Sequence, residues 1–125
     1  MDVQERTVEY YLPASGPPAP FGVWRDSLAD KTAKAAVLAR IARMRGGNFS
    51  DSRPIGGGVC ENRVHWGPGY RIYYGVDGYK IVLLWGGDKS RQAADISKAK
   101  IFWEDYKKRV KRNATKRELQ RRPSR

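Results

Sequence analysis

The stretch 59–89, VCENRVHWGPGYRIYYGVDGYKIVLLWGGDK, decides the fold. Within it, polar and apolar side chains alternate in three runs, which is typical of strands with one buried face. The runs cover residues 59–66, 70–76 and 79–85. Gly67-Pro68-Gly69 separates the first two runs, and Asp77-Gly78, a dipeptide typical of tight hairpins, separates the last two. The stretch therefore predicts three consecutive antiparallel strands.

Pairing Trp66 with Tyr70, and Val76 with Tyr79, sorts the side chains of these strands onto two faces. The apolar face, which we expect to be the core, carries Val64, Trp66, Tyr70, Ile72, Tyr74, Ile81, Leu83 and Trp85. The other face brings together Arg63, His65, Arg71 and Tyr73, beside Val82 and Leu84. Two arginines and the only histidine of the chain, gathered on one sheet, indicate a binding or catalytic site.

The flanking sequence predicts four further elements. They are a strand over 3–12, helices over 21–28 and 31–45, and a longer helix over 90–112. Residues 48–58 are polar and rich in glycine, so we expect a loop there. The order β-α-α-β-β-β-α predicts the α+β class, with a mainly antiparallel sheet, a helical hairpin packed on one face and a C-terminal helix.

Length and composition indicate one domain, expected over residues 1–112, followed by a basic, disordered tail over residues 113–125. The formal net charge is +12, and residues 107–125 contain ten Lys/Arg against one acidic residue, Glu118. A solvated tail and a tail that binds a polyanion, such as RNA, DNA or the ribosome, are equally open interpretations.

One histidine and one cysteine are too few for a usual zinc site or for an intramolecular disulfide, and we expect no cofactor. No apolar run reaches bilayer-spanning length, and the N-terminus lacks the pattern of a secretory signal. We therefore expect a cytoplasmic protein that binds neither a metal ion nor a membrane.

The polar face of the three strands offers groups for metal-free chemistry on an anionic substrate. Arg63 and Arg71 can hold a phosphate by paired hydrogen bonds, and His65 is of the residue type that exchanges protons near neutral pH. Lys89, just after the third strand, can stabilise developing negative charge, and Tyr73 can stack on a base. These groups suit RNA cleavage by attack of a 2′-hydroxyl on the adjacent phosphate.

Structural roles remain open for the same residues. Arg63 can pair with Glu61 or Asp77, and a lone histidine is more often structural than catalytic. On the residues alone, binding of an anion or a nucleic acid is favoured over cleavage. Basic side chains elsewhere form either a solvated face or further RNA contacts. The candidates for such contacts are Arg40, Arg43 and Arg45 of the second helix, and Lys107 and Lys108 of the last helix.

Three segments resemble signatures of RelE/ParE-superfamily toxins. Residues 57–74, GGVCENRVHWGPGYRIYY, resemble GxGVxExRxxxGPGYRVYY. Residues 83–92, LLWGGDKSRQ, resemble LLxGGDKxxQ, and Asp95, Ile96 and Ala99 match its continuation. Residues 40–51, RIARMRGGNFSD, resemble RIxRLxxGNxGD. The resemblance covers residues 8–108 and indicates the branch called addiction module killer proteins, which is related to HigB.

This resemblance implies a RelE-like fold and a type II toxin that arrests translation by ribosome-dependent, metal-independent cleavage of mRNA. It implies neutralisation by a helix-turn-helix antitoxin of the HigA kind, in a toxin–antitoxin hetero-oligomer. Matched onto this chain, the catalytic residues of the family fall on Arg63, His65, Arg71 and Lys89. The C-terminal tyrosine of RelE has no clear counterpart, since the helical pattern makes Tyr106 a core residue; the acid and the base stay unassigned.

Two other functions fit the same resemblance. One is a ParE-like toxin that binds DNA gyrase without catalysing a reaction, because one fold can support both activities. The other is a family member that is not toxic and binds nucleic acid.

Overall fold

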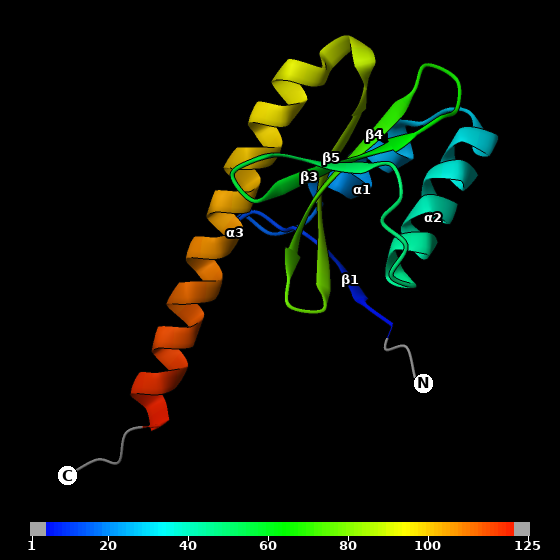
Figure 1. Cartoon of the computed structure of the whole chain (residues 1–125). Coiled ribbons are helices and arrows are strands. Elements are labelled where there is room, and N and C mark those ends of the chain that lie inside the picture. The colour runs from blue at the N-terminus through cyan, green and yellow to red at the C-terminus, as the bar shows by residue number, and fades with distance from the viewer. Residues whose placement is uncertain (1–4, 122–125) are drawn as a thin grey trace.

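The computed structural model describes residues 5–121, in which helices cover both faces of a five-stranded sheet (Figure 1). The helices are α1 (Pro20–Ser27), α2 (Lys31–Arg45) and α3 (Gln92–Arg121), with a short 3-10 helix, η1 (Lys89–Arg91), before α3. The strands are β1 (Thr7–Tyr10), β2 (Ser52–Gly56), β3 (Val59–Val64), β4 (Tyr70–Asp77) and β5 (Lys80–Asp88). The α+β class predicted from the sequence is confirmed.

The sheet is mixed. Its strands lie in the order β1-β5-β4-β3-β2, with β1 parallel to β5 and the other neighbouring pairs antiparallel. β1 is shorter than the strand expected over 3–12, whose first two residues lie outside the described part of the chain. β2 lies within the segment 48–58, which we expected to be a loop. Its sequence does not alternate, and Pro54 is tolerated there because an edge strand leaves one side unpaired.

α1 and α2 pack on the face that the alternation predicts as the core. The buried residues there are Phe21, Val37, Ile41 and Met44 of the helices, and Val64, Ile72, Tyr74, Ile81 and Leu83 of the strands. Asp30 begins α2 as its cap, because its side chain accepts a hydrogen bond from the backbone N–H of Thr32 at 2.8 Å. Both helices of the expected hairpin therefore bury their apolar stripes on this face.

α3 packs on the opposite face of the sheet, which carries the polar candidate residues. The buried residues of this second core are Tyr11, Val59, Tyr73, Val82, Leu84, Ala99, Trp103 and Tyr106. Gly75 of β4 makes this packing possible, since a Cβ at that position would lie 2.5 Å from the ring of Trp103. The helical hairpin therefore covers one face, as predicted, and α3 covers the other, because its apolar stripe needs a face of its own.

The pairing of β3 with β4 differs by two residues from the prediction. Tyr70 pairs with Val64 and not with Trp66, because residues 65–69 together form the turn. The pairing of β4 with β5 is offset by two residues in the same way where residues 74–77 pair with residues 80–83. Since side chains alternate with a period of two, this shift leaves most of them on the predicted face.

Two tryptophans expected on the core face lie elsewhere. Trp66 follows the end of β3 and is 42% exposed. A β-bulge beside Tyr73 inserts one extra residue, Leu84, into β5, and this turns Trp85 onto the face that α3 covers. Alternation cannot reveal such a bulge, because 79–85 reads as one continuous run.

α3 continues through Arg121, where we expected a disordered tail from residue 113 onward. The sequence of this segment, NATKRELQR, is rich in helix-forming residues, and extending a packed helix needs no new nucleus. The rest of the expected tail, residues 122–125, lies outside the described residues. α3 is strongly charged, and among residues 5–121 no helix combines the length and apolarity that crossing a bilayer requires.

Candidate nucleic-acid interface

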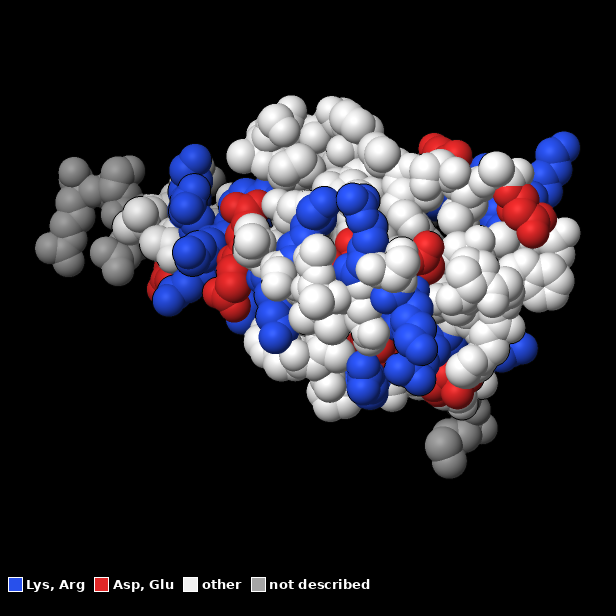
Figure 2. Space-filling model, turned by 90° about the horizontal axis from the view of Figure 1, so that it is seen from above, with Lys and Arg blue, Asp and Glu red and all other residues white. Residues whose placement is uncertain are grey.

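Arg63, His65 and Arg71 line one small pocket of about 80 Å³ at the end of the sheet where β4 begins. Arg63 and Arg71 lie directly opposite each other on neighbouring strands. Seen from this end of the molecule, Lys and Arg side chains gather over the middle of the surface (Figure 2). The structure therefore brings together three of the four residues that the sequence proposed as catalytic.

A buried carboxylate makes this concentration of positive charge tolerable. Glu61 is fully buried, and its oxygens accept hydrogen bonds from Nε of Arg53 at 3.1 Å and Nε2 of Gln92 at 3.0 Å. The Nε atoms of Arg71 and Arg63 lie 3.8 and 3.9 Å from the same carboxylate. Two arginines directly opposite each other would repel, and Glu61 offsets this repulsion from below the pocket.

Arg71 is held rigidly at the base of the pocket. It is 5% exposed, and its Nη1 donates a hydrogen bond to the carbonyl oxygen of Gly69 at 3.0 Å. Its buried Nε finds no hydrogen-bond partner among residues 5–121, although Glu61 lies near. Arg63 differs, because its side chain is 46% exposed and can reach a ligand in solvent. The pocket thus combines a buried guanidinium with an exposed one.

His65 lies at the rim of this pocket, and Lys89 lies near it. The side chain of His65 is 68% exposed, and its Nε2 lies 3.7 Å from a carboxylate oxygen of Asp51. Lys89 is exposed and follows Asp88, the residue that pairs with Tyr70 at the start of β4. Lys89 therefore lies at the same end of the sheet, although it does not line the pocket itself.

Asp88, the acidic residue before Lys89, has a lowered pKa that reflects the groups around it. Hydrogen bonds from the hydroxyl and the backbone N–H of Ser90 lower the pKa of Asp88, and the positive charges of Arg71 and Arg91 add to this effect. Asp88 is therefore a fixed anion that accepts these bonds at the start of η1. Arg91 joins the basic end of the sheet, a role that the sequence did not suggest.

Two of the residues proposed to contact RNA have structural roles. Nη1 of Arg40 donates hydrogen bonds to the carbonyl oxygen of Arg63 at 2.6 Å and to Oδ1 of Asn62 at 3.1 Å, which fastens α2 to β3. Tyr73 is fully buried under α3 and cannot stack on a base in this arrangement. Burial also raises the pKa of its hydroxyl, and the charge of Glu61 adds to that rise.

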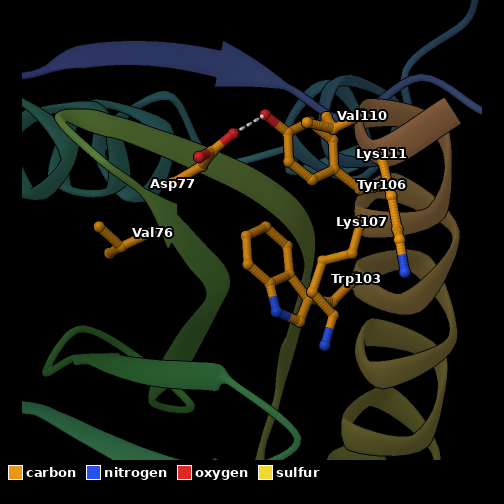
Figure 3. A pocket seen from close by; sticks show the side chains of 7 residues that line it. All are labelled: Val76, Asp77, Trp103, Tyr106, Lys107, Val110 and Lys111. Atoms are coloured by element: carbon orange, nitrogen blue, oxygen red, sulfur yellow. Dashed lines mark hydrogen bonds between the residues drawn. The ribbon is translucent and has the colours of Figure 1, made fainter. Parts of the chain in front are cut away.

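The remaining candidates, Arg43, Arg45, Lys107 and Lys108, do not line the arginine pocket. The carbonyl oxygen of Arg45 accepts a hydrogen bond from the backbone N–H of Arg6, which directly precedes β1. The first residue of β1 pairs with the first residue of β5, so Arg45 lies near the start of β5. Lys107 lines a separate pocket of about 290 Å³ between α3 and the β4–β5 hairpin (Figure 3). The start of β5 and the β4–β5 hairpin form the end of the sheet opposite the pocket, so Arg45 and Lys107 lie toward that end.

Sequence reasoning found one of the residues that support the arginines and missed two. Glu61 was named as a partner of Arg63, because it lies two residues before Arg63 on the same strand and so shares its face. Arg53 could not be found, because β2 gives no alternating pattern. Gln92 contacts Glu61 because α3 folds back over the sheet, which no local pattern reveals. Residues 5–121 hold no group of three His, Cys, Asp or Glu side chains that could bind a metal ion.

Fold and site together define a small α+β domain whose mixed sheet carries an N–H-rich, basic pocket at one end, which suits a phosphate-bearing ligand. An uncharacterized protein of Haemophilus influenzae (strain ATCC 51907 / DSM 11121 / KW20 / Rd) is 42% identical to this chain over 83 residues, which are 66% of this chain and 84% of that protein. The chain belongs to the same family as this protein. No family model and no solved structure matches the chain.

Proposed function

We propose that this protein is the toxin of a type II toxin–antitoxin system and that it cleaves mRNA on the ribosome. The observation that carries the proposal is the shared pocket of Arg63, His65 and Arg71, with Lys89 at the same end of the sheet. The motifs that resemble RelE/ParE toxins specify Arg63 and Arg71 within one continuous segment, 57–74, and Lys89 within 83–92; His65 lies at an unspecified position of the first segment. A RelE-like topology is part of the same proposal.

The reaction is cleavage of a phosphodiester without a metal ion. Arg63 binds a non-bridging oxygen of the scissile phosphate by charge-assisted hydrogen bonds, while Arg71 supplies fixed positive charge behind it. The 2′-hydroxyl attacks phosphorus, so that the O2′–P bond forms and the P–O5′ bond breaks. His65 accepts the proton of the 2′-hydroxyl or returns one to the departing 5′-oxygen. Lys89 stabilises the negative charge that builds on the phosphorane.

Partner and compartment follow from the same proposal. The antitoxin is a helix-turn-helix protein of the HigA kind, which forms a hetero-oligomer with this chain. Translating ribosomes place the reaction in the cytoplasm. An antitoxin that neutralises the toxin at its site would present acidic groups to the pocket, because the exposed Arg63 and Lys89 attract them.

Primer-extension mapping of transcripts after brief induction tests the proposal. The wild type should cut translated messages in phase with codons, and Arg71→Ala and Arg63→Gln should abolish these cuts. Lys31→Gln is the control, because it removes one exposed positive charge at the start of α2 that does not line the pocket, and it should leave the cuts unchanged. Circular dichroism of the purified Arg71→Ala and Arg63→Gln proteins shows whether each keeps the native fold.

Two results would replace the proposal by another function. Intact transcripts together with early loss of DNA supercoiling would assign the protein to gyrase-binding toxins of the ParE kind. Induction without growth arrest and without cuts would leave a nucleic-acid-binding protein that is not toxic. Wild-type toxicity of folded Arg63→Gln and Arg71→Ala proteins would show that the arginine pocket is not the active site.

A further inference from the structure

The last part of α3 extends beyond the sheet as a free helix, which points away from the body of the molecule (Figure 1). Residues 111–121 are exposed throughout. Near its base, Nη2 of Arg109 donates a hydrogen bond to the carbonyl oxygen of Leu12 and thereby ties the helix to the chain after β1. Beyond residue 113 the helix spans about 12 Å at 1.5 Å per residue. We call residues 107–121 the basic arm.

The basic arm concentrates positive charge. It contains eight Lys/Arg and one acidic residue, Glu118. Within residues 5–121, two of these eight basic residues have a carboxylate within 4 Å: Lys107 pairs with Glu104, and Arg109 pairs with Asp105. Like charges also repeat at a spacing of four residues, in the pairs Lys107–Lys111, Lys108–Arg112, Arg112–Lys116 and Arg117–Arg121. Such pairs destabilise an isolated helix, so the arm holds a repulsion that a bound polyanion would relieve.

The outer part of the basic arm, residues 111–121, has no apolar stripe with which to dock on a protein. Its basic residues point in all directions around the helix, and Leu119 is its one large apolar side chain. A helix that is polar all round does not bury a face against a partner. A phosphodiester backbone, by contrast, can contact such a helix from any side, because each phosphate needs only a nearby cation.

We propose that the basic arm binds the phosphodiester backbone of RNA. The choice of RNA as the ligand rests on the proposed function, and the inference extends it to a surface distinct from the arginine pocket. Fifteen residues of α3 separate Lys107 from Gln92, which contacts Glu61 below that pocket, and at 1.5 Å per residue they span about 22 Å. The arm therefore holds a second part of the RNA and raises the local concentration of RNA at the pocket.

Binding of an RNA that cannot be cleaved tests this inference. The probe is a fluorescent 20-nucleotide 2′-O-methyl RNA, which lacks the attacking hydroxyl and so reports affinity whether or not the protein is a nuclease. The full-length arm variant is K111Q/R112Q/K116Q/R117Q. The matched control is K31Q/K34Q/K80Q/K98Q, which removes the same charge from α2, β5 and the first half of α3, at residues outside the arm and the pocket. Anisotropy is measured over a series of salt concentrations.

The arm variant should bind at least tenfold more weakly than the wild type at low salt, and the control should bind within about threefold of it. The slope of log K against log salt should fall by about 3 in the arm variant, because each lost phosphate contact to a single strand removes about 0.7. Equal losses in both variants would show that net charge alone governs binding, and an unchanged arm variant would show that the arm does not bind; either overturns the inference.

The ligand class is tested in the same format. A DNA oligonucleotide of the same length, or vesicles containing phosphatidylserine, replaces the RNA. If either binds through the arm more than tenfold tighter than RNA does, the assignment to RNA is wrong. Circular dichroism must show that both variants are folded, and helix content should rise when RNA is added to the wild type, because phosphates offset the repulsion along the arm.

Discussion

The buried carboxylate of Glu61 lies 3.8 Å from Nε of Arg71, on the face of the sheet that α3 covers. This pair lets the protein place Arg63 and Arg71 directly opposite each other without leaving two positive charges uncompensated. Arg71 is nearly buried, whereas Arg63 is half exposed. A negative charge below the pocket thus supports a positive surface at its mouth.

Glu61→Gln should lower the free energy of unfolding by about 3 kcal/mol, because removal of one partner leaves the buried guanidinium of Arg71 uncompensated. Urea unfolding of purified protein measures this loss. Glu104→Gln is the control: it breaks the exposed pair with Lys107, and it should change stability by less than about 0.5 kcal/mol. Equal effects of the two substitutions would show that Glu61 does not support the arginines.

Gly75→Ala should destabilise the protein by about 2 kcal/mol, because the added methyl group would press on the ring of Trp103 and push α3 away from the sheet. The control is Gly46→Ala. There the nearest contact of an added Cβ, the carbonyl oxygen of Arg43, is an ordinary 3.5 Å away, and φ is −77°. Thermal unfolding compares the two, and a Gly75→Ala protein as stable as wild type would contradict the packing of α3 described here.

Gly75 also shows what a sequence can and cannot predict about this fold. Alternation in 59–89 predicts the central strands, since each residue's face follows from its place in the run. It does not predict the exact pairing, because the turn takes five residues, 65–69, where the Gly-Pro-Gly signal suggests three. The bulge at Leu84 depends on tertiary packing, and so does the contact between α3 and Gly75.

The candidate site, too, has features that a local pattern predicts and features that depend on tertiary packing. Arg63 and Arg71 were predicted to share a face because their spacing of eight residues is even and a hairpin turn lies between them. A local pattern gives the face on which Tyr73 lies but not what covers that face, and α3 buries the ring completely. The bonds of Arg40 to β3 join elements far apart in the sequence, so no local pattern reveals its structural role.

Stability should fall as pH rises from about 10 to about 12. Burial raises the pKa of Tyr11 and Tyr74 to about 12, and it raises those of Tyr73 and Tyr106 as well. A raised pKa means that the folded state holds the phenolic proton more tightly than the unfolded state. This contribution is complete below the unfolded pKa and is lost as pH rises through the folded one. Urea unfolding at several alkaline pH values measures the decline.

Tyr74→Phe is the matched variant for this pH dependence. It removes one of the titrating groups, so its free energy of unfolding should decline less steeply between the same pH limits. The wild type and the variant must therefore be compared as slopes against pH, since the substitution also removes the hydrogen bond to Ser52 at every pH. Parallel slopes would show that burial of Tyr74 does not hold its proton.

Tyr106→Phe should lower the free energy of unfolding by about 1 kcal/mol and leave toxicity unchanged. The hydroxyl of Tyr106 donates a hydrogen bond to Oδ2 of Asp77 at 2.9 Å and thereby ties α3 to the β4–β5 hairpin (Figure 3). Tyr79→Phe is the control, because Tyr79 is 60% exposed. If Tyr106→Phe instead abolished toxicity at wild-type stability, Tyr106 would have to act in catalysis.

His65→Gln should lower the single-turnover rate of cleavage on programmed ribosomes by about 10²-fold or more, the usual contribution of a proton-transfer group. Its unfolding midpoint in urea should stay at the wild-type value, because 68% of the side chain is exposed and its nearest carboxylate, on Asp51, lies 3.7 Å away. Lys89→Gln tests charge stabilisation at the same end of the sheet and should retain the pH profile of the wild type. Arg71→Ala, by contrast, should lose both cleavage and some stability, since its guanidinium is nearly buried beside Glu61. If the His65→Gln protein cleaves at the wild-type rate, His65 does not transfer the proton, and another group at the pocket must do so.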